Sequence, residues 1–216
     1  MIAVVDYKKG NIRSVVRGIE GTGAHVEVID SVDALKSAKA IVLPGVGAFR
    51  DAMESLSELG LVEPLVRAIE DGVPYLGICL GMHILFEGGM EHAEEGNAHP
   101  GLGLLPGVVD RLPAEGYGED GELHRFKLPH VGWNTVSAVS ESEQSILTGL
   151  EDEEYFYFTH SFACPESTYT VAETRHSIAF PSIVRKDDAW GVQFHPEKSS
   201  AAGAKLLQNF VDAYTR

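Results

Sequence analysis

One stretch, Pro74 to His83, constrains the fold of this chain more than any other segment. It reads P-Y-L-G-I-C-L-G-M-H: a short apolar run ends at Cys79, between Gly77 and Gly81, and an apolar helical pattern follows at once. Glycines on both sides of a cysteine allow a sharp strand–turn–helix bend that holds its side chain in a strained, exposed position. A helix N-terminus also favours the thiolate, the form that attacks carbonyl groups. Cys79 is therefore a candidate nucleophile, and the alternative is an inert cysteine buried between two packing glycines.

Strands and helices alternate through the first part of the chain. Apolar runs predict strands over residues 2–5, 25–29, 40–43 and 75–79. Helical spacing predicts helices over residues 12–19 (with Asn11 as N-cap), from Ser31 or Asp33 through Leu35, over 48–56 and over 61–69. This alternation is typical of βαβ units with helices on both faces of a parallel sheet. We expect an α/β fold, a three-layer sandwich with a mostly parallel central sheet, in a single domain over residues 1–216.

The pattern changes after His83. Residues 87–103 are predicted to form a long loop, and residues 113–123 a flexible acidic insertion. Further strands are predicted over residues 104–112, 131–139, 155–158, 169–173, 178–184 and 189–194. The last strand leads to His195-Pro196-Glu197, and Ser199 or Ser200 is expected to cap a closing helix.

Charge and cysteine content restrict the possible partners and surroundings. The formal net charge is −15, from 17 Lys and Arg against 32 Asp and Glu, and such a field repels nucleic acids and anionic membranes. The excess of acid suits either a cell with a salty interior or an ordinary acidic protein. Only two cysteines are present, which favours a reducing compartment over a disulfide scaffold. The chain opens directly into a predicted strand, without a basic leader, so we expect a cytoplasmic protein.

A nucleophilic cysteine needs a base, and the base needs a partner that fixes its tautomer. His195 is the candidate base because it follows a predicted strand and precedes Glu197 by two residues, which lets the carboxylate reach back to the imidazole. Cys79 and His195 both follow strands, and the carboxyl ends of parallel strands meet at one edge of a sheet. Taken alone, His195 could equally be a surface turn histidine and Glu197 a solvated charge.

The glycine-rich turn P-G-V-G at residues 44–47 follows a neighbouring strand. Its backbone N–H groups, together with the amide of Leu80, could stabilise a developing oxyanion. Most Pro-Gly turns are only turns, so this segment is a weak signal by itself.

Two motifs together carry a resemblance to a known family. G-I-C-L-G-M at residues 77–82 and G-V-Q-F-H-P-E-K at residues 191–198 resemble the class I (triad) glutamine amidotransferases. P-G-V-G-A-F at 44–49, P-H-V-G-W-N at 129–134 and Y-F-T-H-S-F at 157–162 are similar to the glutaminase subunits of imidazole glycerol phosphate synthases, of histidine biosynthesis. The likeness runs through nearly the whole chain and implies a flavodoxin-like class I amidotransferase fold.

The resemblance implies a role for each matching position. Cys79, His195 and Glu197 would form the triad that releases ammonia from glutamine, with the N–H groups of Val46 and Leu80 as the oxyanion hole. The implied substrate-binding residues are Gly45, Gly47, His83, Glu91, His160, Ser161 and Phe162. Those implied to face the partner, a (β/α)8-barrel cyclase, are Asn11, Trp133 and Asn134. The partner would receive ammonia and make imidazole glycerol phosphate and aminoimidazole carboxamide ribotide, and this chain would need neither a metal nor a cofactor.

The sequence departs from the family pattern at two places. His83 stands where the family usually has glutamine, and the segments 87–103 and 113–123 look longer than the usual loops, which affects the alignment of Glu91. Three alternatives remain open from the sequence: an amidotransferase subunit of another synthase, a regulatory subunit with a decayed triad, and a free-standing cysteine peptidase. The P-H-V-G-W-N motif argues against the first, and the intact Cys, His and Glu argue against the second.

Overall fold

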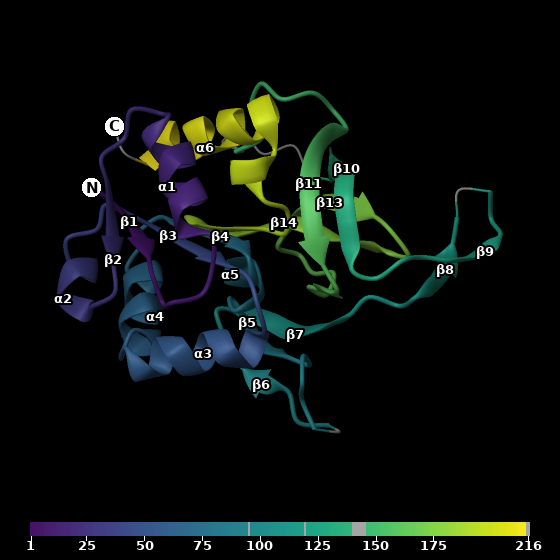
Figure 1. The fold of residues 1–216 in the computed structure, drawn as a ribbon, viewed down its shortest axis with the longest axis horizontal. Helices are drawn as coiled ribbons and strands as arrows, with labels where there is room; N and C mark the ends of the chain where they lie inside the picture. Colours follow the sequence, from purple (N-terminus) through teal and green to yellow (C-terminus); the bar gives the residue numbers. More distant parts are fainter. Residues whose placement is uncertain (95, 119, 140–145, 215–216) are drawn as a thin grey trace.

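The computed structural model describes residues 1–94, 96–118, 120–139 and 146–214. The predicted segments 87–103 and 113–123 therefore each contain one residue, 95 and 119, outside the described ranges. A large sheet of nine described strands runs through the molecule (Figure 1). Its spatial order is β11 (Glu154–His160), β10 (His130–Ala138), β13 (Thr170–Arg175), β14 (Ala179–Lys186), β15 (Ala189–Val192), β4 (Tyr75–Cys79), β3 (Ala40–Gly45), β1 (Ile2–Val5) and β2 (Val26–Ile29).

The sheet has a parallel half and an antiparallel half. β15, β4, β3, β1 and β2 pair in parallel, whereas β14, β13, β10 and β11 extend the sheet from β15 by antiparallel pairing. The register sets Gly45 opposite Cys79 and Gly191 opposite Gly77. The carboxyl ends of β3, β4 and β15 therefore meet at the same edge, which is where sites form in open α/β sheets.

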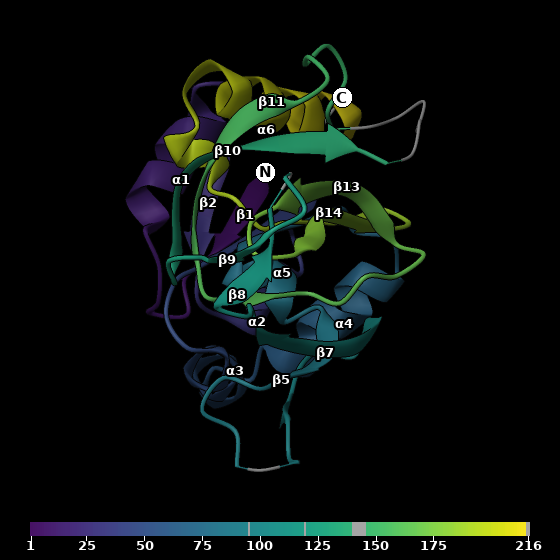
Figure 2. The same ribbon diagram turned by 90° about the vertical axis from the view of Figure 1, so that its right-hand side faces the viewer.

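Helices cover both faces of the parallel half (Figures 1 and 2). α1 (Ile12–Glu20) and α6 (Ser200–Tyr214) lie together on one face, and α3 (Phe49–Glu58) and α4 (Val62–Glu70) lie on the other, with α2 (Val32–Leu35) beside α4. The predicted α/β class, with helices on both sides of the sheet, is confirmed. The sheet as a whole is mixed, and its parallel strands form the half that the helices enclose.

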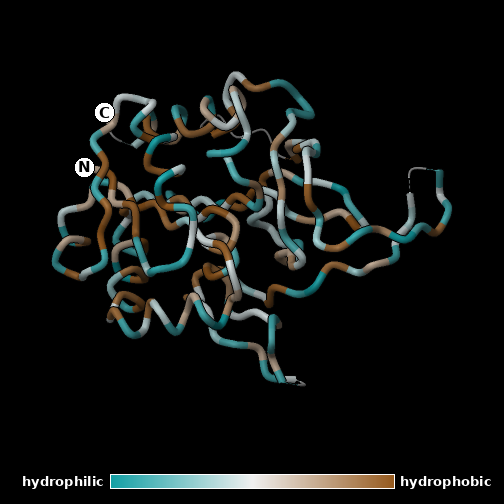
Figure 3. The backbone as a smooth tube through the Cα atoms, in the orientation of Figure 1, coloured by the Kyte–Doolittle hydropathy of each residue, from teal (hydrophilic) through white to brown (hydrophobic). Residues whose placement is uncertain are grey.

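The period-two alternation of the strands builds two separate hydrophobic cores. Ile2 and Val4 of β1 pack in the core beneath α1 and α6, whereas Ala3 and Val5 pack in the core beneath α3 and α4. Every residue of β1 is buried, which explains why its sequence is continuously apolar rather than alternating. Figure 3 shows the same concentration of hydrophobic backbone segments through the middle of the molecule.

Two segments predicted as loops contain strands. The segment 87–103 contains most of β5 (Phe86–Gly89) and all of β6 (His99–Pro100). With β7 (Leu105–Arg111) and β12 (Phe162–Ala163) they form a second, four-stranded sheet among the described residues. The predicted acidic insertion contains β8 (Glu115–Tyr117), which pairs with β9 (Leu123–Arg125) in a hairpin that projects from the body (Figure 1). The loop predictions were wrong at these places because strands of two to four residues show too little periodicity to be recognised.

Smaller differences concern helix ends. The helical pattern after Cys79 gives only the four-residue helix α5 (Leu80–His83). Asn11 is at the N-cap position of α1 but makes no side-chain capping bond. The Ser199 hydroxyl donates a 2.6 Å hydrogen bond to the His195 carbonyl oxygen and does not cap α6. None of the helices in the described ranges is long and apolar enough to cross a membrane.

Candidate active site

Cys79 occupies the sharp turn between β4 and α5. Its backbone has φ 53° and ψ −104°, which is a strained conformation for a residue with a side chain. The glycines on either side are required by close packing: a Cβ on Gly77 would lie 2.2 Å from the Gly81 carbonyl oxygen, and a Cβ on Gly81 would lie 1.9 Å from the Leu43 carbonyl oxygen. The structure therefore shows the strained elbow that the two glycines predict. The side chain is less accessible than predicted, because Cys79 is only 7 % exposed.

His195 and Glu197 form a buried pair at the end of β15. Nδ1 of His195 lies 3.0 Å from Oε1 of Glu197, and both side chains are at most 2 % exposed. The short 3₁₀ turn Pro196–Lys198 brings the carboxylate back toward the imidazole. The backbone N–H of His195 donates to the Tyr157 carbonyl oxygen at 2.9 Å, which ties this turn to β11. The pair has the geometry in which a carboxylate fixes the tautomer of a base.

The electrostatic surroundings of His195 favour its protonated form. Burial alone would lower the pKa of this imidazole, but the neighbouring Cys79 sulfur and the Glu197 carboxylate together raise the pKa to about 9. Nε2 is buried and makes no hydrogen bond with any described residue, so proximity to Cys79 acts here without a formed bond. The arrangement favours a protonated imidazole next to the cysteine, with Nε2 available to a reacting group.

The glycine-rich turn 44–47 lies at the end of β3, directly beside the cysteine elbow. Gly45 pairs with Cys79 in the sheet, and a Cβ on Gly45 would meet the Tyr7 hydroxyl at 2.2 Å. Val46 is 40 % exposed, and Gly47 has φ +108°, a conformation that glycine adopts readily. Gly45 is thus held in place by close packing, whereas Val46 and Gly47 form an exposed part of the turn whose backbone can change conformation.

A pocket of about 280 Å³ opens at this edge of the sheet. Its lining residues are Val46, Gly47, Cys79, Leu80, His83, Glu91, Thr159, His160, Ser161 and Phe162. The structure therefore brings together nine of the sequence-predicted site residues around one opening. Gly45 pairs with Cys79 in the sheet, and the His195–Glu197 pair lies next to Cys79. Thr159 was not predicted.

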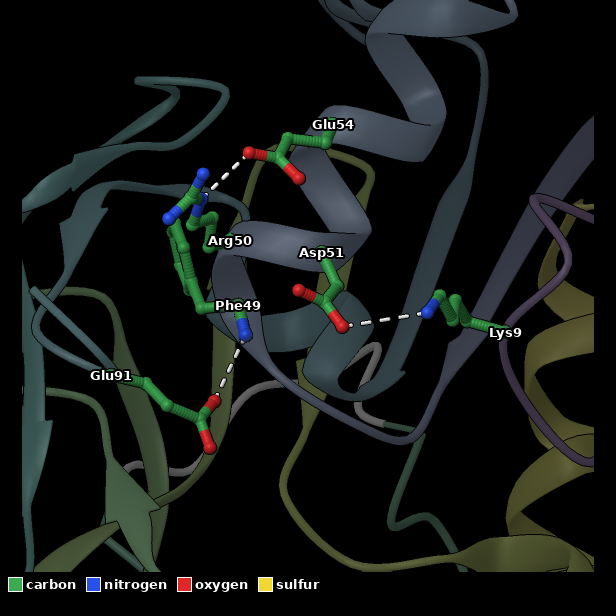
Figure 4. A network of polar contacts seen from close by, with 6 residues as sticks. All are labelled: Lys9, Phe49, Arg50, Asp51, Glu54 and Glu91. Carbon is green, nitrogen blue, oxygen red and sulfur yellow. Dashed lines mark hydrogen bonds and ion pairs between the residues drawn. The ribbon is translucent and has the colours of Figure 1, made fainter.

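Glu91 connects the pocket to the start of α3. Its Oε2 accepts a 2.9 Å hydrogen bond from the backbone N–H of Phe49, as Figure 4 shows. Asp51, in the first turn of the same helix, pairs with Lys9 at 3.4 Å. The N-cap residue of α3, Ala48, has no side chain that could accept such a bond, so Glu91 supplies the cap from a distant segment. Its carboxylate also places a negative charge on the pocket lining.

The histidines of the pocket are held neutral by burial. Burial lowers the pKa of His83 to about 4, and it lowers the pKa of His160 well below the ordinary range. His160 is fixed on both ring nitrogens, by the Phe162 carbonyl oxygen at 2.8 Å and by His130 at 2.9 Å. These two side chains therefore add no positive charge to the pocket lining.

One buried residue next to the cysteine was missed by the sequence analysis. Gln193 is completely buried, and its Nε2 lies 3.7 Å from the Cys79 sulfur while its Oε1 lies 2.7 Å from Nε2 of His83. The signal was present, because Gln193 is a lone polar residue in the apolar run W-G-V-Q-F, but it was read only as part of a strand.

The predicted interface residues lie away from the pocket. Asn11 is exposed at the start of α1, and Trp133 on β10 is 51 % exposed. The side-chain amide of Asn134 instead donates to the Arg175 carbonyl oxygen at 2.9 Å. Neighbouring residues of a strand point to opposite faces, so the side chains of Trp133 and Asn134 leave β10 on opposite sides.

A larger cavity of about 790 Å³ lies between α3, α4 and β6, lined in part by the Arg50–Glu54 ion pair seen in Figure 4. It contains neither the cysteine nor the buried His–Glu pair, so the smaller pocket is the candidate site. Within the described part of the chain, no three His, Cys, Asp or Glu side chains are placed to hold a metal ion.

Comparison with known proteins matches residues 3–213 to the family Glutamine amidotransferase class-I. Imidazole glycerol phosphate synthase subunit HisH of Desulfitobacterium hafniense strain Y51 is 46% identical over 212 residues, covering 97% of this chain and 93% of that protein. The HisH subunit of Syntrophotalea carbinolica is 42% identical over 214 residues, covering 98% and 100%. A crystal structure of a glutamine amidotransferase superimposes with a TM-score of 0.72 over 100% of this chain and 99% of that one, at 18% identity, which supports the fold.

Proposed function

Because this chain belongs to the class-I glutamine amidotransferases, and within them to the HisH subunits of imidazole glycerol phosphate synthase, we propose that it hydrolyses glutamine with a Cys79–His195–Glu197 triad. The observation that carries the proposal is the buried His195–Glu197 pair, joined at 3.0 Å, behind a cysteine held on a strained elbow. The whole chain, residues 1–216, acts as one amidotransferase domain in this proposal.

The chemistry follows from the roles of the three side chains. Cys79 gives its proton to Nε2 of His195, and the thiolate attacks the side-chain carbonyl carbon of glutamine, so that a C–S bond forms and an electron pair moves to oxygen. The intermediate collapses, the C–N bond breaks, and the nitrogen leaves as ammonia with the proton returned by His195. Water then gives a proton to His195 and attacks the γ-glutamyl thioester, which releases glutamate and restores the thiol. Glu197 holds the imidazole in one orientation throughout.

The backbone N–H groups of Val46 and Leu80 stabilise the oxyanion in this proposal. Leu80 follows the nucleophile directly, and Val46 lines the same pocket from the glycine-rich turn. In this proposal the glycine-rich turn reorients the Gly45–Val46 peptide so that the Val46 N–H points into the pocket, and the hole is completed only in one of two conformations of the turn. This would keep glutamine hydrolysis low until a partner favours the active conformation.

The remaining pocket residues bind the amino-acid end of glutamine. Glu91 places a carboxylate on the lining, which suits the substrate's ammonium group, while Ser161 and Phe162 offer backbone groups. Gly45 also supports the elbow by close packing, because its Cβ position is filled by the Tyr7 hydroxyl.

We place the partner, a (β/α)8-barrel cyclase, on the surface that includes Trp133 and Asn11. The HisH relatives are named as subunits, which supports a heterodimer in which ammonia passes directly to the cyclase. Trp133 and Val131 are each more than half exposed on the same face of β10, and exposed aromatic residues are frequent at interfaces. A nucleophilic thiol also needs reducing surroundings, which supports a cytoplasmic location.

Replacing Cys79 by alanine tests the proposal. We expect Cys79→Ala to abolish glutamate release while the cyclase, mixed with the variant and supplied with ammonium salt, still makes its products. The matched control is Cys164→Ala, which removes the other cysteine and should keep glutamine hydrolysis within about twofold. Glutamate release by folded Cys79→Ala would remove Cys79 as the nucleophile. Full glutamine hydrolysis by the wild-type chain without any cyclase would be consistent with the triad but would contradict the proposed dependence on the cyclase.

A further inference from the structure

Gln193 stands between two groups of the pocket, the Cys79 sulfur and the His83 ring. Its Nε2 lies 3.7 Å from Sγ, and its Oε1 lies 2.7 Å from Nε2 of His83. Gln193 is fully buried, and His83 is 6 % exposed, so water does not compete for these contacts. The backbone N–H of Gln193, the residue after β15, donates to the Ser182 carbonyl oxygen at 2.9 Å, which fixes the backbone that carries the side chain.

A side-chain amide in this position has two possible orientations. In one, the NH₂ group donates toward sulfur and the carbonyl oxygen accepts from Nε2–H of His83. In the other, the oxygen faces sulfur and the NH₂ group donates to an unprotonated Nε2. Only the first is compatible with a thiolate, because the second brings the negative end of the amide dipole against the negative sulfur. The orientation of Gln193 is therefore coupled to the proton on Cys79.

His83 determines which orientation is favoured. Burial lowers its pKa to about 4, so the ring is neutral at physiological pH and carries one proton. A proton on Nε2 makes His83 a donor to Oε1 and locks the NH₂ group of Gln193 toward the sulfur. The contact of 2.7 Å is short, which suits a well-formed bond between a ring N–H and a carbonyl oxygen.

We propose that Gln193 donates a hydrogen bond to the Cys79 thiolate and so activates the nucleophile, and that His83 is a positioning residue that holds Gln193 in the donating orientation. The inference deepens the proposed glutaminase function and rests on it for the role of Cys79. It also gives His83, where glutamine is usual in the family, a second task besides lining the pocket. A glutamine at position 83 carries a side-chain NH₂ group and could make the same bond to Oε1.

The reactivity of Cys79 toward iodoacetamide tests this arrangement without any need for glutamine or a partner. The thiolate displaces iodide from the reagent, so the alkylation rate at pH 7 reports the fraction and the nucleophilicity of the thiolate. The background is Cys164→Ala, which leaves one cysteine. We expect Gln193→Leu, of similar size but without a donor, to slow alkylation at pH 7 about tenfold, because hydrogen bonds to charged groups are among the strong ones.

The pH dependence of alkylation distinguishes a thiolate that has lost its hydrogen bond from a sulfur that the reagent can no longer reach. Base removes the thiol proton with or without the hydrogen bond, so the two rates should converge as the pH is raised. The titratable groups that face Cys79 and His83 in both proteins are His195, Tyr7 and His160, because Cys164, which also lies near Cys79, is alanine in the shared background. A rate for Gln193→Leu within twofold of the background at pH 7, in a protein with native circular dichroism, would overturn the proposal.

Variants at position 83 test the positioning role and remain informative if Gln193→Leu does not fold. His83→Phe keeps a ring but has no donor. We expect about threefold slower alkylation at pH 7, because Gln193 is still present but is no longer held in the donating orientation. His83→Gln restores a donor and should bring the rate back to within twofold. If His83→Gln reacts as slowly as His83→Phe, the bond to Oε1 has no effect and the positioning role is wrong.

Steady-state kinetics of the chain in complex with the cyclase and the cyclase's substrate (the loaded complex) give a second readout. Gln193 does not line the pocket, so Gln193→Leu should lower kcat about tenfold and leave KM for glutamine within about twofold. A change confined to KM would assign Gln193 to substrate binding and contradict the proposal. Should the wild-type chain alkylate rapidly but hydrolyse no glutamine, the proposed function fails, whereas the effect of Gln193 on Cys79 can still be measured.

Discussion

Replacing Glu197 by glutamine removes the charge that keeps His195 protonated, and the structure gives the size of the effect. Cys79 and Glu197 raise the pKa of His195 from 6.5 to about 9 against the opposing effect of burial. At about 1.4 kcal/mol per pH unit, this corresponds to about 3 kcal/mol of stabilisation of the folded state. Both neighbours contribute, so we assign roughly half to Glu197 and expect Glu197→Gln to lower the free energy of unfolding by about 2 kcal/mol at pH 6.

The sign of the pH dependence follows from the direction of the shift. A raised pKa stabilises the folded protein fully below 6.5, and this contribution is lost as the pH rises through about 9. The destabilisation by Glu197→Gln should therefore be largest at pH 6 and close to zero at pH 10. Since both side chains are at most 2 % exposed, solvent screens the pair little and the effect should persist at moderate salt concentrations.

Urea unfolding at pH 6 and pH 10, followed by circular dichroism, measures both values. The matched control is Glu63→Gln, because Glu63 is an 84 % exposed carboxylate that pairs with Arg67 at 3.6 Å. We expect the control to change the free energy of unfolding by less than about 0.5 kcal/mol at either pH. Equal destabilisation of Glu197→Gln at both pH values would refute the reasoning, because it would indicate lost packing rather than lost charge. In the loaded complex the same variant should lose about 10³–10⁴ in kcat.

Three further outcomes follow from the geometry of the site and its surroundings. Gly81→Ala should lower the free energy of unfolding by more than about 3 kcal/mol, because the new Cβ would lie 1.9 Å from the Leu43 carbonyl oxygen. The control Gly60→Ala has open space around a residue with positive φ, and it should cost about 1 kcal/mol in the same urea titration. Trp133→Ala should weaken binding to the cyclase at least tenfold by calorimetry while the unfolding midpoint of the free chain stays the same, and an unchanged dissociation constant would exclude Trp133 from the interface. Glutamine hydrolysis should decline as the pH rises through about 9, where His195 loses the proton it gives to the leaving ammonia; a flat rate profile to pH 10.5 would contradict that role.

The sequence predicted the parts of this fold that are fixed by local physical chemistry. Buried parallel strands read as continuous apolar runs, so β1 and β4 were recognised with their observed ends at Val5 and Cys79. The two glycines around Cys79 predicted a sharp turn. The structure shows why they are needed, because a Cβ on Gly77 would meet the Gly81 carbonyl oxygen and a Cβ on Gly81 would meet the Leu43 carbonyl oxygen. Where a prediction depended on one short segment and its sterics, it could be made without the structure.

Contacts between distant segments could not be predicted in the same way. β12 has two residues and exists because β7 offers it an edge, so its sequence alone carries no strand signal. The hydrogen bond between Glu91 and the Phe49 N–H joins positions 42 residues apart, and no local pattern in either segment predicts it. The opposite orientations of Trp133 and Asn134 could have been predicted, since the alternation of a strand follows from its pleat.

The antiparallel half of the sheet explains how His195 reaches the cysteine. A parallel neighbour for β4 normally arrives through a helical crossover, but β15 arrives through a tight hairpin from β14, with Asp187 at φ 53° in the turn. The chain must therefore first cross the sheet antiparallel to β4, and β10, β11 and β13 extend the edge that this crossing creates. The same excursion brings Thr159 to Phe162 to the far wall of the pocket. The nucleophile thus comes from the parallel half of the sheet, while its base and part of its substrate pocket depend on strands that the chain adds antiparallel beside it.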